Sequence, residues 1–171
     1  MRNILFCFLL GLSSFAFSQS NGNPPESPQS KAYTAKQKVL RARGSEALAA
    51  ENAREKTIPC KEEESSNGRD ECVGRDLQVT QKNYESYAKE IGDLLRLRDP
   101  DDPDAATYPD RGKEFDRAEL LWVRYRYDQC KTVSDGSFGG TIQTQISLTC
   151  RQDLTRSHMH ELESLYSDLW N

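Results

Sequence analysis

Apolar side chains recur every three to four positions along much of the chain, and no useful stretch alternates apolar and polar residues. The clearest period lies between residues 76 and 97. The residues that share one face there are Leu77, Thr80, Tyr84, Tyr87, Ile91 and Leu94. This spacing predicts an amphipathic helix with that face in the core. Because a strand pattern is missing, the sequence predicts an all-α domain of three to four helices.

Three other segments favour helix but have less regular faces. Residues 31–56 are rich in good helix formers, and their weak apolar face consists of Tyr33, Val39, Leu40 and Leu48. We expect this helix to lie loosely on the domain, with Gly44 kinking or ending it. The stripe predicted to be buried in residues 112–130 is Phe115, Ala118, Leu121, Trp122 and Tyr125. The inner face predicted for residues 143–170 is Ile146, Cys150, Leu154, Leu162, Leu165 and Leu169.

Polar segments separate the predicted helices. Asn67-Gly68 is typical of a turn. Residues 99–110 are rich in proline and aspartate, and proline prevents a helix from continuing through them. Oxygen-rich loops bind calcium, but this segment lacks the EF-hand spacing, so we interpret it as a solvated loop. Residues 131–141 are predicted to form a glycine-rich loop between two cysteines.

The N-terminal residues have the composition of a secretory signal peptide. Arg2 supplies a positive charge, and residues 4–17 are apolar and uncharged. We expect cleavage near Ser18, with Ser20 as the alternative, followed by a flexible leader over residues 19–30. The apolar run is short for a membrane span. The sequence therefore favours a soluble protein of the periplasm or the cell exterior, without a membrane anchor.

Four cysteines remain after cleavage, because Cys7 belongs to the predicted signal peptide. An even number of cysteines in a small exported domain indicates disulfides. Three pairings are possible, and we favour Cys60–Cys72 and Cys130–Cys150 because each pair brackets one polar segment. Each bridge is expected to contribute about 3 kcal/mol to stability.

Charge and candidate chemistry narrow the function. The chain has 23 basic and 27 acidic residues, a net charge of -4. An acidic protein is poorly suited to nucleic acid or an anionic membrane, and well suited to a cationic partner. His158 and His160 are two positions apart and point in different directions on a helix, so we interpret both as solvated surface residues. The sequence predicts a binding or structural protein that is not an enzyme and uses no cofactor or metal.

Residues 122–130, Trp-Val-Arg-Tyr-Arg-Tyr-Asp-Gln-Cys, resemble the W-x-x-Y-R-D-x-x-C block of the lysozyme inhibitor LprI-like family of small exported bacterial domains. The resemblance runs from Cys60 to about Leu165, although Tyr127 stands at the aspartate position. It implies inhibition of lysozyme, a cationic partner that an acidic protein attracts. The predicted organisation is a signal peptide over 1–18, a leader over 19–30, a helical extension over 31–57 and the family domain over 58–171.

Two groups of candidate site residues follow. Trp122, Tyr125 and Arg126 are predicted to be structural, with Trp122 and Tyr125 in the core and Arg126 on the indole. The predicted lysozyme contact is the disulfide-held loop 131–141, and its contact residues are Ser134, Asp135, Ser137 and Phe138. A mobile connector is the alternative interpretation of this loop. For the whole protein, the alternatives are a structural or adaptor protein without a lysozyme target and an enzyme acting on envelope polymers. The sequence leaves the oligomeric state open.

Overall fold

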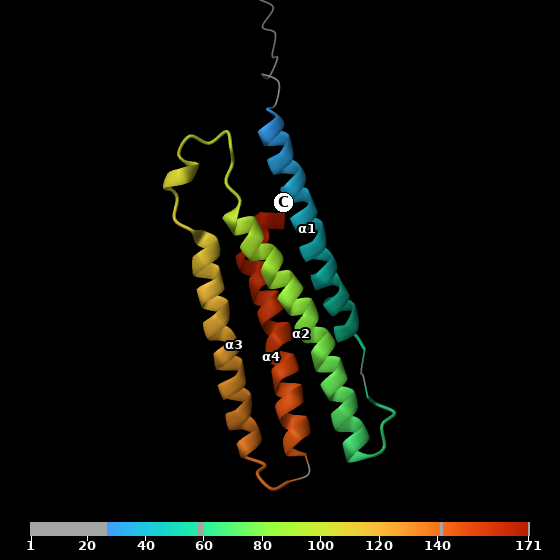
Figure 1. Ribbon diagram of the computed structural model, residues 1–171. Coiled ribbons are helices and arrows are strands. Elements are labelled where there is room, and N and C mark those ends of the chain that lie inside the picture. The colour runs from blue at the N-terminus through green and yellow to red at the C-terminus, as the bar shows by residue number, and fades with distance from the viewer. Residues whose placement is uncertain (1–26, 58–59, 141, 171) are drawn as a thin grey trace, which may run out of the picture.

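The computed structural model describes residues 27–57, 60–140 and 142–170, and in these ranges it contains helices and no strand. The elements are α1 (Pro28–Glu55), α2 (Ser66–Arg96), the 3-10 helix η1 (Ala105–Thr107), α3 (Arg111–Asp135), α4 (Gln143–Leu165) and the 3-10 helix η2 (Ser167–Trp170). Successive long helices run in alternating directions, and α2 packs against the other three (Figure 1). The predicted all-α class is confirmed. The predicted signal peptide lies outside the described residues.

Both predicted disulfides are confirmed. Cys60 pairs with Cys72 and Cys130 with Cys150, with Cα–Cα distances of 5.7 and 5.6 Å. The first bridge ties the segment before α2 to its second turn, and the second ties α3 to α4. A search of the described helices for one long and apolar enough to cross a membrane finds none.

The inner face predicted for α2 is confirmed in full. The six residues from Leu77 to Leu94 that share it are all buried. The helix begins at Ser66 rather than Asp76, because the Ser65 hydroxyl accepts a hydrogen bond from the Gly68 backbone N–H at 3.0 Å and so caps it. The Asn67-Gly68 pair, predicted to form a turn, therefore lies in the first helical turn.

The expectation that the first helix packs loosely is wrong. Leu40, Ala47 and Leu48 of α1 are buried, and the last two belong to the main hydrophobic core. Val39, in contrast, is exposed. Since α1 begins at Pro28, the end of the predicted flexible leader is helical.

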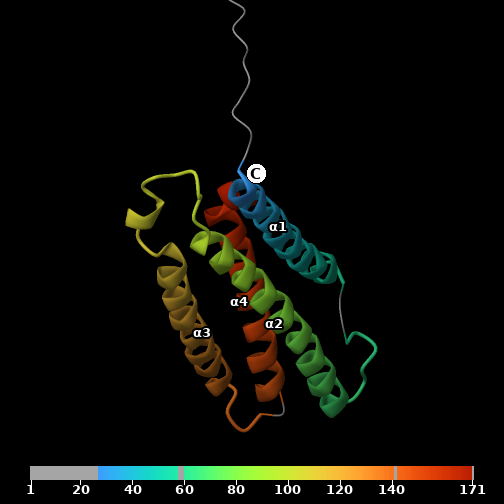
Figure 2. The same cartoon turned by 45° about the horizontal axis from the view of Figure 1, so that its top comes forward.

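Gly44 neither kinks nor ends α1, which is continuous through it. Its role is to leave space, because a Cβ atom there would overlap the Trp170 indole of η2. The same indole stacks on Tyr87 of α2, with ring centroids 5.4 Å apart. The segment after α4 therefore lies against α1, as Figure 2 shows from a second direction.

The buried stripe of α3 differs from the predicted one. Phe115 is buried and Trp122 packs against the core, but Ala118, Leu121 and Tyr125 are exposed. The residues that are buried instead are Gly112, Arg126, Cys130 and Ser134. These positions follow the helical period in a different phase, because the disulfide and the hydrogen bonds of the Arg126 guanidinium fix which side of α3 faces inward.

The inner face of α4 is more polar than predicted. Its buried residues are Gln152, Thr155, His158, Met159 and Leu162. Leu162 is buried, as predicted, whereas Leu165, which was also predicted to face inward, is exposed. Because α4 is held largely by polar contacts with the other helices, apolar spacing alone did not identify its inner face.

Candidate functional site

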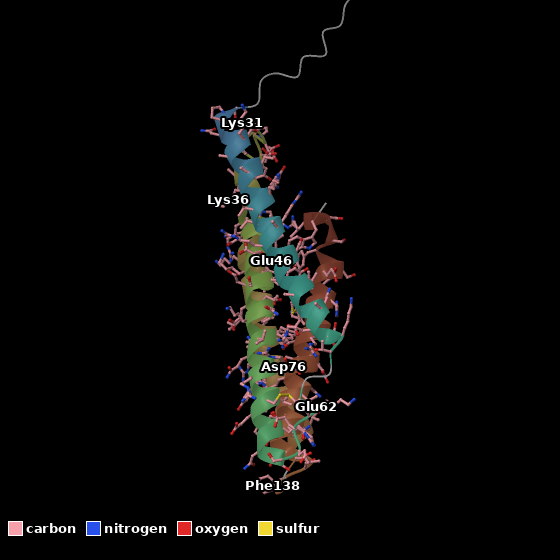
Figure 3. The ribbon with its side chains drawn as sticks, turned by 90° about the vertical axis from the view of Figure 1, so that its right-hand side faces the viewer. Lys31, Lys36, Glu46, Glu62, Asp76 and Phe138 are labelled. Atoms are coloured by element: carbon pink, nitrogen blue, oxygen red, sulfur yellow. A yellow bond between two sulfur atoms is a disulfide. The ribbon has the colours of Figure 1, made fainter. Side chains whose placement is uncertain are left out.

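The loop between α3 and α4 lies at one end of the bundle. It follows Asp135 and leads to Gln143, and the Cys130–Cys150 disulfide joins the two helices close behind it. Phe138 lies at the extreme end of the molecule (Figure 3), and its side chain is 86% exposed. The fold thus presents an aromatic ring to solvent on a covalently braced helical hairpin.

Tight turns form the described part of this loop. The backbone N–H of Phe138 donates to the Asp135 carbonyl at 3.1 Å, and that of Gly140 donates to the Ser137 carbonyl at 2.9 Å. Gly139 has a φ of 79°, in the left-handed region that glycine adopts without steric cost. The loop therefore holds Phe138 outward through its own backbone hydrogen bonds.

The loop is shorter than the sequence predicted, because residues 131–135 belong to α3. The Lys131 ammonium lies 2.6 Å from the Asp135 carboxylate, an i,i+4 pair that supports the last helical turn. Ser134 is buried, and its hydroxyl donates to the Lys131 carbonyl at 3.0 Å, so little of this predicted contact residue is exposed in the free protein. Ser137 is partly buried, and Phe138 is the predicted contact residue with the most exposed side chain.

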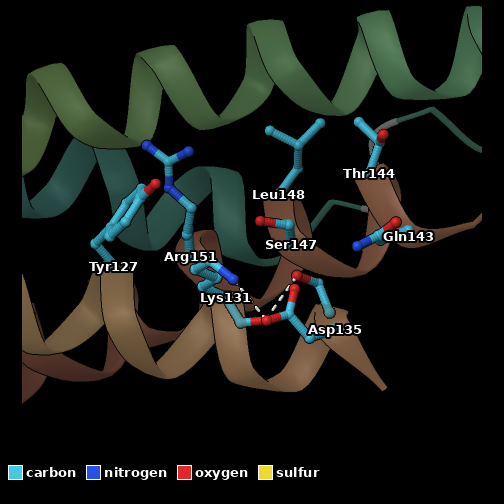
Figure 4. Close-up of a pocket in the computed structure, with 9 residues that line it drawn as sticks. Tyr127, Lys131, Asp135, Gln143, Thr144, Ser147, Leu148 and Arg151 are labelled. Atoms are coloured by element: carbon cyan, nitrogen blue, oxygen red, sulfur yellow. Dashed lines mark hydrogen bonds and ion pairs between the residues drawn. The ribbon is translucent and has the colours of Figure 1, made fainter. Parts of the chain in front are cut away.

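A polar cleft of about 410 Å³ runs between α3 and α4 behind this loop (Figure 4). The side chains drawn from α3 include Tyr127 and Lys131, and those from α4 include Ser147 and Arg151. Lys131 points to Asp135, whereas the Arg151 guanidinium lies beside the Tyr127 ring and points away from the loop. No sequence pattern indicates a role for Arg151, since a lone arginine in a helix has no recognisable spacing to other functional residues.

The tryptophan of the motif, Trp122, belongs to a second cluster in the bundle interior. His158 stacks on the Trp122 indole with ring centroids 4.0 Å apart and an interplanar angle of 9°. The predicted contact of Arg126 with the indole is present, with the guanidinium carbon 5.1 Å from the ring centroid. The prediction that Tyr125 enters the core is wrong, because its side chain is exposed.

His158 is buried, so its interpretation as a solvated residue is also wrong. Its Nε2 lies 3.1 Å from a Glu119 carboxylate oxygen and its Nδ1 lies 2.9 Å from Glu161. Burial lowers the pKa of His158, but the hydrogen bonds and charges of the two glutamates outweigh it, and the net pKa is raised above 6.5. Tyr84 donates to Glu119 at 2.8 Å, which completes a satisfied polar network.

His160 agrees with its interpretation as a surface residue, since it is exposed and lies 3.0 Å from Glu55. A search of the described residues for three or more His, Cys, Asp or Glu side chains that could hold a metal ion finds none. The polar cluster around His158 joins α2, α3 and α4 in the bundle interior. The α3–α4 loop, in contrast, faces solvent.

The chain matches a known protein family. The family model for the lysozyme inhibitor LprI matches residues 60–162, which span α2, α3, the loop between α3 and α4, and most of α4. The chain matches no curated protein and no solved structure. The matched region includes both disulfides and is more than half of the 171 residues. The chain therefore belongs to the lysozyme inhibitor LprI family.

Proposed function

We propose that this protein is exported and inhibits a lysozyme by inserting the α3–α4 loop into the substrate cleft of the enzyme. The observation that carries the proposal is the family match over residues 60–162, which contains this loop. The role is non-catalytic, because the protein acts by blocking another enzyme. The proposed compartment is the periplasm or the cell exterior, where the two disulfides would form and persist.

The geometry of the loop supports this mode of inhibition. An aromatic ring that is exposed in the free protein and buried in a partner's cleft is typical of an energetic anchor at an interface. The Cys130–Cys150 bridge and the turn hydrogen bonds restrict the loop before it binds. Less conformational entropy is then lost on binding, so more of the contact free energy appears as affinity.

Charge supports the same partner. The chain has a net charge of -4, and lysozymes are typically cationic. Opposite net charges accelerate encounter and make the association rate fall as salt screens the interaction. Phe138 would then supply the short-range contact that charge alone does not.

The test is a titration of oxidised protein into lysozyme acting on cell walls, with animal-type and bacterial-type enzymes. Phe138→Ala is expected to weaken inhibition at least about tenfold, the effect of losing an interface anchor. Its melting temperature should stay unchanged, because the ring contacts solvent. The matched control is Leu165→Ala, another exposed apolar side chain.

Two outcomes would contradict the proposal. If the Leu165 variant loses inhibition while the Phe138 variant keeps it, the loop is not the contact. If the folded wild-type protein inhibits no lysozyme, the inhibitor function itself is refuted. The adaptor function then becomes the better explanation, and the exposed Leu120, Leu121 and Tyr125 on α3 favour a protein partner at that face.

A further inference from the structure

A second cleft of about 490 Å³ lies where α2, α3 and α4 meet, and it shares Leu148 and Arg151 with the first cleft. Three cationic side chains line it, Lys82, Arg126 and Arg151, together with one carboxylate, Glu85. The local charge is therefore +2, in a chain whose net charge is negative. Such a concentration of positive charge needs a physical explanation.

Arg126 is buried, with only 5% of its surface exposed, and its hydrogen-bond partners are neutral. Its Nη1 donates to the Gln81 side-chain oxygen at 2.6 Å and to the Thr155 hydroxyl at 2.7 Å. Its Nε is buried and has no hydrogen-bond partner. Among the described residues, no carboxylate forms an ion pair with it. A buried charge without a counter-charge is costly, so an anion that reached it would be stabilised.

Arg151 lies next to Arg126 and is also without a counter-charge. Its guanidinium forms no hydrogen bond or ion pair with the described residues, and Figure 4 shows it beside the Tyr127 ring. Burial, followed by the positive charge of Arg151, lowers the pKa of Arg126. The two guanidinium groups thus repel each other across a cleft that they both line.

Two other arginines at the helix contacts are paired with carboxylates. Arg54 and Arg156 both form ion pairs with Glu51, and Arg54 also pairs with Asp76. The chain therefore pairs these two arginines with carboxylates, whereas Arg126 and Arg151 form no ion pair with the described residues and share their cleft with a single carboxylate, Glu85. This contrast within one bundle suggests that the missing negative charge comes from a ligand.

We propose that the cleft binds a small organic anion, with its carboxylate group between Arg126 and Arg151. Guanidinium groups present parallel N–H donors that match the two oxygens of a carboxylate. The resulting charge-assisted hydrogen bonds are stronger than those from neutral donors. Leu77 and Leu148 form apolar walls beside them, which suit a short apolar portion of the ligand. The volume is in the range of small-molecule sites.

Glu85 determines which anion fits. It accepts a hydrogen bond from the Gln81 amide at 2.8 Å, and the same Gln81 side chain accepts from Arg126, so Glu85 is held at the cleft. Its negative charge repels additional negative charge on a ligand. The cleft therefore selects a singly charged carboxylate over doubly charged phosphate. This inference does not depend on lysozyme inhibition.

The test follows the arginine Nε–H resonances of the full oxidised chain by NMR during titration with three probes. N-acetylalanine carries one carboxylate, its amide is the neutral analogue, and inorganic phosphate is the competing anion. Saturable shifts at Arg126 and Arg151 are expected with N-acetylalanine, none with the amide, and weaker binding with phosphate. Equal shifts with the amide, tighter binding of phosphate, or no saturation at millimolar N-acetylalanine would each overturn the proposal.

Arg151→Gln is the informative variant, because Arg126 lies in the bundle interior. It is expected to weaken N-acetylalanine binding at least about tenfold, through the loss of charge-assisted hydrogen bonds. Its melting temperature should not fall, since Arg151 has no partner to lose. The matched control, Arg124→Gln on the exposed side of α3, should bind as the wild type does. Unchanged binding in the Arg151 variant, or an equal loss in the control, would refute the assignment.

Discussion

Glu51 is the residue whose replacement should most clearly show how α1 is held. It belongs to α1 and its side chain is 2% exposed. Its carboxylate accepts hydrogen bonds from Thr80 at 2.7 Å, from Asn83 at 2.8 Å and from Arg156 at 2.8 Å. Two of these partners are on α2 and one is on α4. A single buried carboxylate thus joins three helices, one of which lies before the region that matches the family.

Two substitutions separate its charge from its hydrogen bonds. Glu51→Gln keeps the shape and one acceptor, and should cost about 1.5–3 kcal/mol, the range for hydrogen bonds to a charged group. Glu51→Ala removes the carboxylate altogether, so that Arg156 keeps only its ion pair with Asp76, at 3.8 Å. This variant should lose about 3–5 kcal/mol of unfolding free energy. At about 2–4 °C per kcal/mol for a domain of this size, the alanine variant should melt about 6–20 °C lower.

The effect should depend on pH in a defined direction. Burial raises the pKa of Glu51, but hydrogen bonds from Arg156, Thr80 and Asn83 lower it, and the net pKa falls below its ordinary value of 4.5. The ionised carboxylate therefore stabilises the fold above pH 4.5, and this stabilisation is lost as the pH falls through the lower pKa of the folded state. The difference between wild type and the glutamine variant should shrink on acidification.

Thermal and urea unfolding, followed by circular dichroism at neutral and acidic pH, provides the measurement. Glu46→Gln is the matched control, because Glu46 is an exposed glutamate on the same helix. If the Glu51 and Glu46 variants are equally stable at neutral pH, the buried network does not anchor α1. That result would support the predicted division into an extension over 31–57 and a separate domain over 58–171.

Two further predictions concern the disulfide and the interior histidine. Replacing Cys130 and Cys150 by serine should cost about 3 kcal/mol in urea unfolding, by the loop-closure argument; equal stability of the oxidised wild type and the double variant would contradict it. For His158→Gln, the stability lost relative to wild type should be largest below pH 6.5 and should decline as the pH rises through the raised pKa of the folded state, because protonated His158 pairs with Glu119 and Glu161. A deficit that grows at alkaline pH would refute this reasoning.

The sequence was most informative where burial and hydrophobicity coincide. On α2 the residues at spacings of three and four are apolar or nearly so, and they are the ones that pack inward. The cysteine pairing was also predictable, because each pair brackets a connecting segment. Turn signals were weaker, since Asn67-Gly68 became helical once Ser65 capped the first turn.

The sequence was least informative where polar groups are buried. Arg126 and His158 are both in the bundle interior, whereas Leu121 and Tyr125 are exposed on the same helix as Arg126. A hydropathy pattern predicts the opposite, with Leu121 and Tyr125 buried and the two polar residues exposed. Both side chains find hydrogen-bond partners on other helices, Gln81 and Thr155 for Arg126 and Glu119 for His158, and such partners are visible only in three dimensions. The loop between α3 and α4 is shorter than predicted because the Lys131–Asp135 pair, at i,i+4 spacing, supports helix through residue 135.

The close fit of Trp170 against Gly44 has a consequence for folding during the proposed export. These residues are far apart in sequence, and a chain that crosses a membrane N-terminus first delivers α1 and α2 long before Trp170. Until then, Tyr87 of α2 lacks the indole that stacks on it. The early helices can associate while translocation continues, but the groove at Gly44 closes only when the segment after α4 arrives. In an exported chain, the packing of Trp170 against Gly44 therefore follows the translocation of α1, α2, α3 and α4.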